Sequence, residues 1–445
     1  MENIILNTKC GELKGYEFED YLEFRGIKYA NAERWEYPVP VTKWEGVYDA
    51  TEFGPCCPQT RAYEDDKSSS EFYWREFRQG LSFTYGEKDC LCLNVWAPKN
   101  AEKAPIAIYI HGGSFSGGSN DEGQIVTPSF AQNGIVYVTI NYRLNAFGFA
   151  NHPDLTDSEG RCGNFGLYDQ ICAIQWVKDN AEAFGGDAEN ITVIGASAGA
   201  MSVDILLSSP LCEGLFQRAI MMSGAGMQRW IARPRTPEKC KPFWEAVMQN
   251  AGVNSMSELK ALDAKDLYYA WNKASKEVKM SIFFTLPSID GKLLTESSYT
   301  MKTIPSLPMI FGTTSNDMMA PIILKRIAQH YGKKSKKNAN VYYYSFNRHT
   351  PGDESGAWHS SDILYAFSTL DFNWRPFEEI DYKISNEMAK SFYAFIKTGD
   401  PNCNAIPKWE VNNYNKPMRF CEDTKQMKWD SKTMLSYTLN KRGTF

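Results

Sequence analysis

A serine flanked by glycines is the segment of this chain best suited to covalent chemistry. Residues 190–200 read NITVIGASAGA, a β-branched run that leads into Gly195-Ala196-Ser197-Ala198-Gly199 and then into a helical pattern expected to begin near Met201. G-x-S-x-G between a strand and a helix holds a nucleophilic serine on a sharp turn, with its hydroxyl projecting from the sheet. Five residues alone could be an ordinary glycine-rich turn, but these flanks favour a nucleophile at Ser197.

A second glycine-rich segment could supply what such a nucleophile needs. Ile110-His111-Gly112-Gly113-Ser114-Phe115 follows directly on an apolar run. Attack on a carbonyl group builds negative charge on its oxygen, and preorganised backbone N–H groups stabilise that charge. We predict that the N–H groups of Gly113, Ser114 and Ala198 form this oxyanion hole and that His111 braces the loop. A tight glycine turn without this role is the alternative for the segment alone.

Short apolar runs must position both segments. These runs are unbroken rather than alternating, which is typical of strands buried on both faces of a parallel sheet; they cover residues 106–110, 135–140, 191–194, 219–222 and 308–311. Helical periodicities lie at 167–177, 259–271 and 384–395. The alternation predicts an α/β fold with a mostly parallel central sheet flanked by helices. Residues 231–288 carry helical patterns without a strong strand, so we expect a helical cap-like insertion there.

The composition excludes several classes of protein. Hydrophobic residues make up 43% and charged residues 23% of the 445 residues, which is typical of globular chains and excludes general disorder. A net charge of −5 argues against nucleic-acid binding. No apolar run approaches the ~20 residues of a membrane helix, and no paired CxxC motifs indicate a zinc site. The N-terminal residues show no secretory pattern, so we expect a cytoplasmic protein unless a leader was removed.

The strings around both glycine-rich motifs closely resemble the type-B carboxylesterase family, which includes cholinesterases and neuroligins, and in particular its shorter bacterial-type members. The match is dense between residues 24 and 226 and then resumes; its strings include FRGIKYA, WEGVYDATEFGPCCPQ, EKDCLCLNVWAP, NYRLNAFGF, FGTTSND, GAWHSSDILYAF and FYAFIKTGDPN. The resemblance implies a single α/β-hydrolase domain over residues 1–445. It also implies hydrolysis of carboxylic esters without a metal or organic cofactor.

The resemblance further implies an acid and then a histidine downstream of the serine. The histidine falls on His359 in GAWHSSD, with His349 as the rival among five histidines. The acid falls on Asp317 in FGTTSND, where the family usually has Glu; Asp362 is the alternative, at a position where the family's acid is structural. In this reading Ser197 is the nucleophile and His359 its base. Asp317 would fix the imidazole tautomer and stabilise the imidazolium.

Other residues have expected supporting roles. Ser223, in MMSGAG, matches a family serine that hydrogen-bonds near the acid, although a simple turn residue is the alternative. Phe115 and Trp230 are possible walls of the substrate pocket. Ala196 stands where the family usually has Glu, so the chain lacks a carboxylate that would lie beside the histidine.

Two of the cysteines carry an expectation from the same resemblance. Cys57 and Cys90 match the first disulfide pair of the family, and Cys56 and Cys92 are adjacent competitors. In a cytoplasmic protein the bond could be absent.

Taken together, these features predict a serine-dependent hydrolase of small to medium carboxylic esters that acts through an acyl-enzyme. Its partner would be a small-molecule ester, with no nucleic acid or membrane. Two alternatives remain open. One is an inactive, neuroligin-like binding module, although such members lose the serine that this chain keeps. The other is a lactone, thioester or amide hydrolase with the same three residues.

Overall fold

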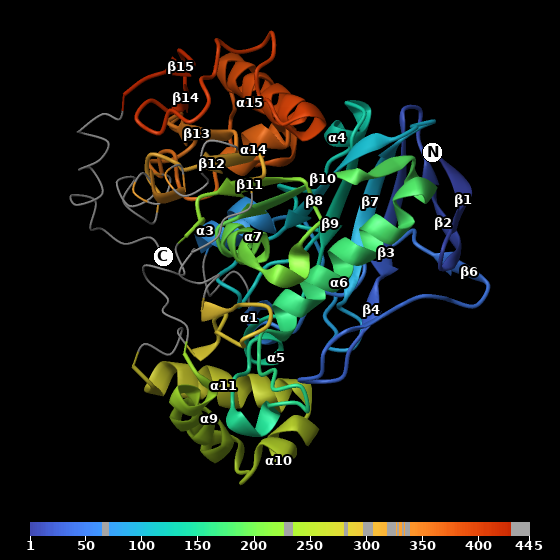
Figure 1. Cartoon of the computed structure of the whole chain (residues 1–445), viewed down its shortest axis with the longest axis vertical. Coiled ribbons are helices and arrows are strands. Elements are labelled where there is room, and N and C mark those ends of the chain that lie inside the picture. The colour runs from blue at the N-terminus through green and yellow to red at the C-terminus, as the bar shows by residue number, and fades with distance from the viewer. Residues whose placement is uncertain are drawn as a thin grey trace.

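A long twisted sheet forms the centre of the computed structural model, which describes residues 1–64, 71–226, 235–279, 284–296, 306–317, 326, 329–331, 333 and 339–428 (Figure 1). The strand order is β1-β2-β3-β7-β9-β8-β10-β11-β12-β13-β14-β15, and β6 pairs with β2. From β9 to β14 in this order, each strand is parallel to the next, whereas β7 pairs with β9 and β15 pairs with β14 in antiparallel fashion. The mostly parallel sheet predicted from the unbroken apolar runs is therefore confirmed.

The predicted strands correspond to the centre of this sheet. They are β8 (Ala104–Ile110), β9 (Val136–Ile140), β10 (Gly186–Ala196), β11 (Arg218–Met222) and β12 (Met309–Gly312). The remaining strands are β1 (Glu2–Thr8), β2 (Gly11–Glu17), β3 (Tyr21–Lys28), β4 (Ala30–Asn31), β5 (Val39–Pro40), β6 (Val47–Asp49), β7 (Cys92–Pro98), β13 (Val341–Phe346), β14 (Met418–Phe420) and β15 (Lys425–Gln426).

Helices cover the sheet; the periodicities at 167–177 and 384–395 fall in α6 and α15, and the one at 259–271 is divided between α10 and α11. The longer ones are α6 (Phe165–Asn180), α7 (Ala198–Ser208), α9 (Pro237–Ala251), α11 (Ala264–Glu277) and α15 (Glu379–Thr398). The shorter ones are α1 (Thr60–Tyr63), α3 (Glu71–Phe77), α4 (Ser129–Gln132), α5 (Asn145–Gly148), α10 (Met256–Ala261) and α14 (Asp362–Ala366), with 3₁₀ turns η1 (Pro153–Leu155), η2 (Ala181–Phe184), η3 (Pro210–Cys212) and η5 (Leu370–Phe372). Within the described ranges, no helix has both the length and the apolar character needed to cross a membrane.

One predicted helix boundary was wrong. The helix after the serine begins at Ala198, not near Met201. The reason is that Ser197 alone makes the turn between β10 and α7, so the next residue is already helical.

Helices α9, α10 and α11 lie together at one end of the molecule, away from α15 (Figure 1). They fall within residues 231–288, where the sequence shows helical patterns without a strand. The Arg34 guanidinium holds this group to the N-terminal region, because it donates to the carbonyl oxygens of Lys260 and Leu262 at 3.0 and 2.6 Å and is paired with Glu87.

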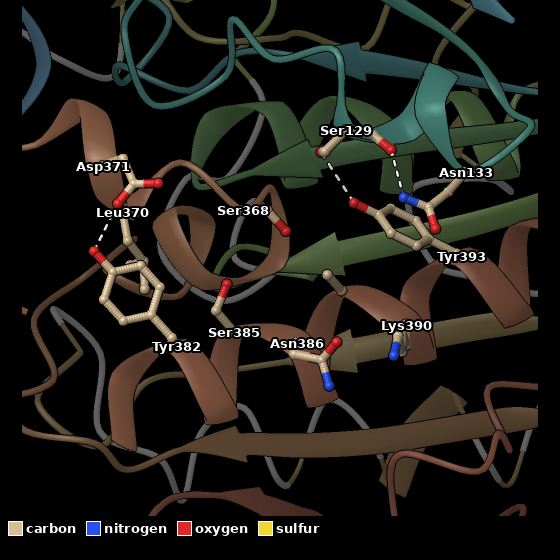
Figure 2. A pocket seen from close by; sticks show the side chains of 11 residues that line it. Ser129, Asn133, Ser368, Leu370, Asp371, Tyr382, Ser385, Asn386, Lys390 and Tyr393 are labelled. Carbon is tan, nitrogen blue, oxygen red and sulfur yellow. Dashed lines mark hydrogen bonds between the residues drawn. The ribbon is translucent and has the colours of Figure 1, made fainter. Parts of the chain in front are cut away.

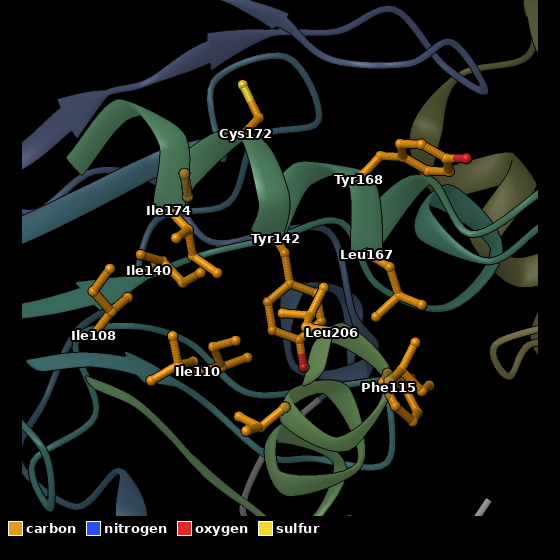
Figure 3. Close-up of a cluster of buried hydrophobic side chains, with 14 of the residues drawn as sticks. Ile108, Ile110, Phe115, Ile140, Tyr142, Leu167, Tyr168, Cys172, Ile174 and Leu206 are labelled. Atoms are coloured by element: carbon orange, nitrogen blue, oxygen red, sulfur yellow. The ribbon is translucent and has the colours of Figure 1, made fainter. Parts of the chain in front are cut away.

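The core beneath the site is built from strand residues packed against α6 and α7. Figure 3 shows Ile108, Ile110 and Ile140 facing side chains of the two helices. Tyr142 lies within this cluster, and its hydroxyl donates to the carbonyl oxygen of His111 at 3.0 Å. The hydrophobic core therefore supports the loop that follows β8.

We expect Gly312→Ala to destabilise the fold by about 1–3 kcal/mol, because an added methyl group overpacks a filled core. A Cβ at this position, the end of β12, would lie 1.8 Å from the Tyr344 ring. Tyr344 cannot move aside easily, since it is buried and its hydroxyl donates to Asp362 at 2.6 Å. Urea unfolding monitored by circular dichroism measures the change.

Gly86→Ala is the matched control for this prediction. Its Cβ would meet nothing closer than 3.5 Å. Equal unfolding midpoints for Gly312→Ala and the unsubstituted protein would contradict the packing argument.

Candidate active site

Ser197 occupies a strained turn between β10 and α7. Its φ is 54° and its ψ is −122°, a backbone conformation that residues other than glycine rarely adopt. Two hydrogen bonds hold the turn: the Ser197 N–H donates to the Met222 carbonyl at 2.9 Å, and the Ser197 carbonyl accepts from the Met201 N–H at 3.0 Å. Strain of this kind persists where the surroundings over-determine it, and it is concentrated at functional sites.

The glycines of the motif are required by close approach of the backbone. A Cβ on Gly199 would lie 2.0 Å from the Ile110 carbonyl oxygen, and a Cβ on Gly195 would lie 2.3 Å from the Gly199 carbonyl oxygen. Gly224, after β11, would place a Cβ 2.0 Å from the Ser197 carbonyl oxygen. Three neighbouring segments can therefore converge on the serine only because these positions lack side chains.

The loop after β8 packs directly against the serine. A Cβ on Gly112 would lie 3.1 Å from the Ser197 Cβ. Gly113 and Ser114 both have positive φ, 101° and 54°, so the loop turns sharply beside the hydroxyl. Ala198 begins α7, where a backbone N–H has no acceptor within the helix. The N–H groups predicted to form an oxyanion hole thus belong to segments that meet at Ser197.

His111 supports this loop through a ring contact and a hydrogen bond. Its ring stacks on Tyr142 with centroids 4.5 Å apart, and its Nδ1 lies 2.8 Å from the Gly112 carbonyl oxygen. Burial lowers the pKa of His111 to about 4, so the imidazole is neutral near pH 7. These contacts fit the bracing role expected of His111.

His359 and Asp317 form a buried pair. The His359 Nδ1 lies 2.7 Å from the Asp317 Oδ1, and both side chains are almost completely buried. A carboxylate accepts hydrogen bonds, so Nδ1 carries the proton and leaves Nε2 as the basic nitrogen. Within the described part of the chain, this buried Nε2 has no hydrogen-bond partner.

The loops that carry the two side chains are joined beside the pair. Asn316 and Ala357 exchange two hydrogen bonds: the Asn316 N–H donates to the Ala357 carbonyl at 3.0 Å, and the Ala357 N–H donates to the Asn316 Oδ1 at 3.1 Å. The second Asp317 oxygen accepts from the Thr313 hydroxyl at 3.1 Å. No motif indicated Asn316, although it lies next to Asp317 in FGTTSND.

The contact between Asp317 and His359 shifts the pKa of both side chains. Burial by itself would raise the pKa of Asp317, but the His359 charge and hydrogen bond, together with the Ser223 hydroxyl, bring that pKa below its ordinary value. Burial would lower the pKa of His359, but the charges of Asp317 and Asp362 outweigh it, so the pKa lies above its ordinary value. The geometry therefore favours an ionised acid beside a histidine of increased basicity. Ser223 lies near the acid, but among the described residues its buried hydroxyl has no hydrogen-bond partner within bonding geometry.

The two rival residues are placed differently. His349 is exposed, whereas His359 is buried against its carboxylate. Asp362 accepts a hydrogen bond from the Tyr344 hydroxyl at 2.6 Å, and burial raises the pKa of Asp362 to about 6. Asp317, not Asp362, is hydrogen-bonded to the His359 ring.

A small cavity of about 30 Å³ opens beside Ser197. Ser197, Ser360 and the glycines of the oxyanion loop line it together, so the serine and the residue after His359 face one space. The rest of the lining consists of residues that no motif indicated: Arg61, Tyr73, Phe77, Tyr109, Glu122, Gln124, Ile125 and Ile363. No motif marks these residues, because they come from segments that are far apart in the sequence.

Two of the lining residues are charged. The Arg61 guanidinium lies 2.9 Å from the Glu122 carboxylate. Ala196 also lines the cavity, so the position where the family usually has Glu does face this space.

Of the two aromatic residues expected in the pocket wall, Phe115 is absent from the lining of the described cavity. Phe115 is fully buried and packs on Phe149 with ring centroids 5.0 Å apart, so it belongs to the core and not to the lining of the described cavity. Trp230 lies outside the described residues.

All eleven cysteines are free thiols in this structure, so the expected Cys57–Cys90 disulfide is not formed. A hydrogen bond to Cys57 and burial raise the pKa of Cys90 well above its ordinary value. The two thiols are thus neighbours in the fold.

A larger hollow of about 260 Å³ lies away from the serine, between α4, η5 and α15 (Figure 2). Many of its polar groups bond to one another: Tyr393 donates to Ser129 at 3.0 Å, and Tyr382 donates to Asp371 at 2.6 Å. It contains none of the predicted catalytic residues, so the smaller cavity is the candidate site.

Comparison with known proteins agrees with this arrangement. The model of the carboxylesterase family matches residues 2–334 and 320–437. A para-nitrobenzyl esterase of Bacillus subtilis is 30% identical, over 91% of this chain and 92% of its own length. The solved structure of a PNB esterase has a TM-score of 0.83 at 27% identity and covers 97% of this chain and 99% of its own. A Clostridium hathewayi esterase, described as hydrolysing aliphatic aromatic polyesters, has a TM-score of 0.78 at 26% identity, with 98% and 99% coverage.

A parallel sheet with a serine turn at the end of its central strand defines an α/β-hydrolase. The chain belongs to the carboxylesterase family and is a carboxylic ester hydrolase.

The Asp362 carboxylate contributes to the raised pKa of His359, which gives a test on pH dependence. A histidine base must be neutral to act, so kcat/KM rises with pH through the pKa of that base. Asp362→Asn removes a negative charge and so lowers the pKa of His359. We therefore expect the acidic limb of the kcat/KM profile to move to lower pH, by roughly 0.5–1 unit.

Asp371→Asn, on η5, serves as the control for a charge removed at a distance. A limb that stays in place or moves to higher pH in Asp362→Asn would show that this carboxylate does not tune His359.

Proposed function

We propose that the protein hydrolyses its esters in two steps through an acyl-enzyme on Ser197. His359 Nε2 takes the proton from the Ser197 hydroxyl as the oxygen attacks the ester carbonyl. The oxyanion is stabilised by the N–H groups of Gly113, Ser114 and Ala198. Asp317 keeps the imidazole in the tautomer that presents Nε2 and stabilises the imidazolium.

The same imidazole completes both half-reactions. The protonated His359 gives its proton to the departing alcohol, and the acyl group remains on Ser197. His359 then activates a water molecule that attacks the acyl-enzyme, and the acid is released as Ser197 recovers its proton. No other residue needs to change its protonation state.

The observation that carries this proposal is the 2.7 Å contact between Asp317 and His359. It orients Nε2 as the basic nitrogen, and the residue after His359 lines the same cavity as Ser197. An inactive, neuroligin-like module would not require this buried pair next to a strained serine. Ester hydrolysis is also what the printed names of the similar proteins describe.

The proposed substrates are small to medium carboxylic esters. The cavity beside the serine is small, and part of its wall is aromatic. We also propose that α9, α10 and α11 form the cap of this single hydrolase domain. A lactone, thioester or amide bond would use the same residues, so the bond type is tested together with the activity.

We expect Ser197→Ala to fold normally and to lose activity by about 10³-fold or more, because the covalent intermediate cannot form. A panel of p-nitrophenyl esters with increasing acyl length measures the activity and the acyl preference of both proteins. Full residual activity in the variant would place the nucleophile elsewhere.

A fluorophosphonate probe provides an independent test of the same role. It should label the folded protein on Ser197 and should not label the alanine variant. No adduct on the folded protein would support an inactive binding module, and negligible turnover of the ester panel with cleavage of an amide would overturn the proposed bond type.

A further inference from the structure

The short helix α3 lies between the catalytic cavity and the loop of the histidine. Tyr73 and Phe77 of this helix line the cavity. The rings of Phe72 and Phe77 pack edge-on against Trp358, with centroids 5.2 and 6.0 Å away. Trp358 directly precedes His359, so one helix contacts both the space for the substrate and the segment that carries the base.

This helix needs external support. It has seven residues, and isolated helices shorter than ~12 residues are marginal in water. The Glu76 side chain is fully buried and accepts from the Arg375 Nε and Nη2 at 3.1 and 2.8 Å and from the Trp374 indole N–H at 2.9 Å. The Glu76 carbonyl oxygen also accepts from Gln124 at 3.1 Å, and Gln124 lines the cavity.

Arg375 carries the connection to the histidine loop. Its side chain is also fully buried. It donates to the Pro351 carbonyl at 2.8 Å, to Asp353 at 3.0 Å and to the Ser355 hydroxyl at 3.1 Å. These residues belong to the segment that leads to His359. The Glu76–Arg375 pair therefore joins α3 to this segment by charge-assisted hydrogen bonds that water does not reach.

The position of the cavity indicates which part of the ester it receives. A departing alcohol takes its proton from the histidine, so it leaves on the histidine side of the serine. Ser360 and Ile363, which follow His359, line the cavity together with Ser197. Its volume of about 30 Å³ gives room for little more than a water molecule. A longer alcohol therefore needs more room than the cavity holds, and Tyr73 and Phe77 of α3 form part of the wall that limits it.

We propose that Glu76 and Arg375 form a positioning pair that holds α3 against the His359 loop and so limits the size of the alcohol that the site accepts. The pair touches neither the substrate nor the reacting atoms; it acts through Tyr73 and Phe77. This inference rests on the proposed function. It assigns the proposed limit on the size of the alcohol to a buried ion pair behind the cavity wall.

Two ester series separate the alcohol side from the acyl side. Methyl, butyl and hexyl acetate vary the alcohol, with turnover followed by acid release; p-nitrophenyl acetate and butyrate vary the acyl group with a fixed leaving group. We expect Glu76→Ala to raise the ratio of kcat/KM for hexyl over methyl acetate by at least about fivefold. The reason is that kcat/KM changes strongly when a hydrophobic pocket begins to accept additional methylene groups of a substrate. The butyrate-to-acetate ratio should stay within about twofold.

Phe77→Ala tests the wall without leaving a buried charge unpaired. It removes a ring from the cavity, so it should raise the hexyl-to-methyl ratio in the same direction. Glu76→Gln keeps a carbonyl acceptor for Arg375 and Trp374, and its ratio should lie between those of the unsubstituted protein and Glu76→Ala.

Glu87→Ala is the matched control. Glu87 forms a similar two-pronged pair with Arg34, at 2.6 and 2.5 Å, but this pair holds the region of α10 and does not contact the cavity. We expect Glu87→Ala to leave the hexyl-to-methyl ratio unchanged, even if the variant is less stable.

The outcomes distinguish the two proposals. An unchanged ratio in Phe77→Ala, or an equal change in Glu87→Ala, overturns the positioning role. If Glu76→Ala does not fold, an unchanged ratio in Glu76→Gln overturns it instead. An unsubstituted protein that hydrolyses none of these esters would contradict the proposed function, whereas an active protein with constant ratios contradicts only this inference.

Discussion

The hydrogen bond between Asp317 and His359 is the interaction on which the arrangement of the site depends. Removing two ionisable groups from water is costly, and a buried pair is tolerated only when its geometry is good and its remaining lone pairs are satisfied. Both conditions hold for the carboxylate, because the two atoms are 2.7 Å apart and Thr313 donates to the second carboxylate oxygen. Among the described residues, the His359 Nε2 is left without a partner. The hydrogen bonds between Asn316 and Ala357 fix the two loops, so the pair does not have to hold them together alone.

The serine side depends on a different constraint, the exclusion of side chains. Ser197 has a backbone conformation that its residue type disfavours, and the parallel strands on either side supply the contacts that hold it there. Gly199 and Gly224 let the β8 and β11 segments approach within distances that no Cβ would allow. The sheet thus stores strain at the end of one strand and balances it with hydrogen bonds and packing in its neighbours.

The charged side chains around the site have two different roles. Near His359, the carboxylates of Asp317 and Asp362 face the imidazole and increase its basicity, while Ala196 adds no charge of its own. The Arg61–Glu122 and Arg375–Glu76 pairs are structural, because each charge has an opposite partner close by. Aromatic side chains of α3 separate the second of these pairs from the cavity.

Local features could be predicted from the order of the residues: the serine motif, the glycine-rich loop and the buried strands are each a pattern over a few adjacent residues. The predicted start of α7 was too late, since the turn takes only one residue. Resemblance to a family pointed to His359 and Asp317, which are 42 residues apart in the sequence. The surroundings of these residues, including Asn316, the α3 wall and the core position of Phe115, depend on how the chain folds, because such contacts join residues that no short pattern relates.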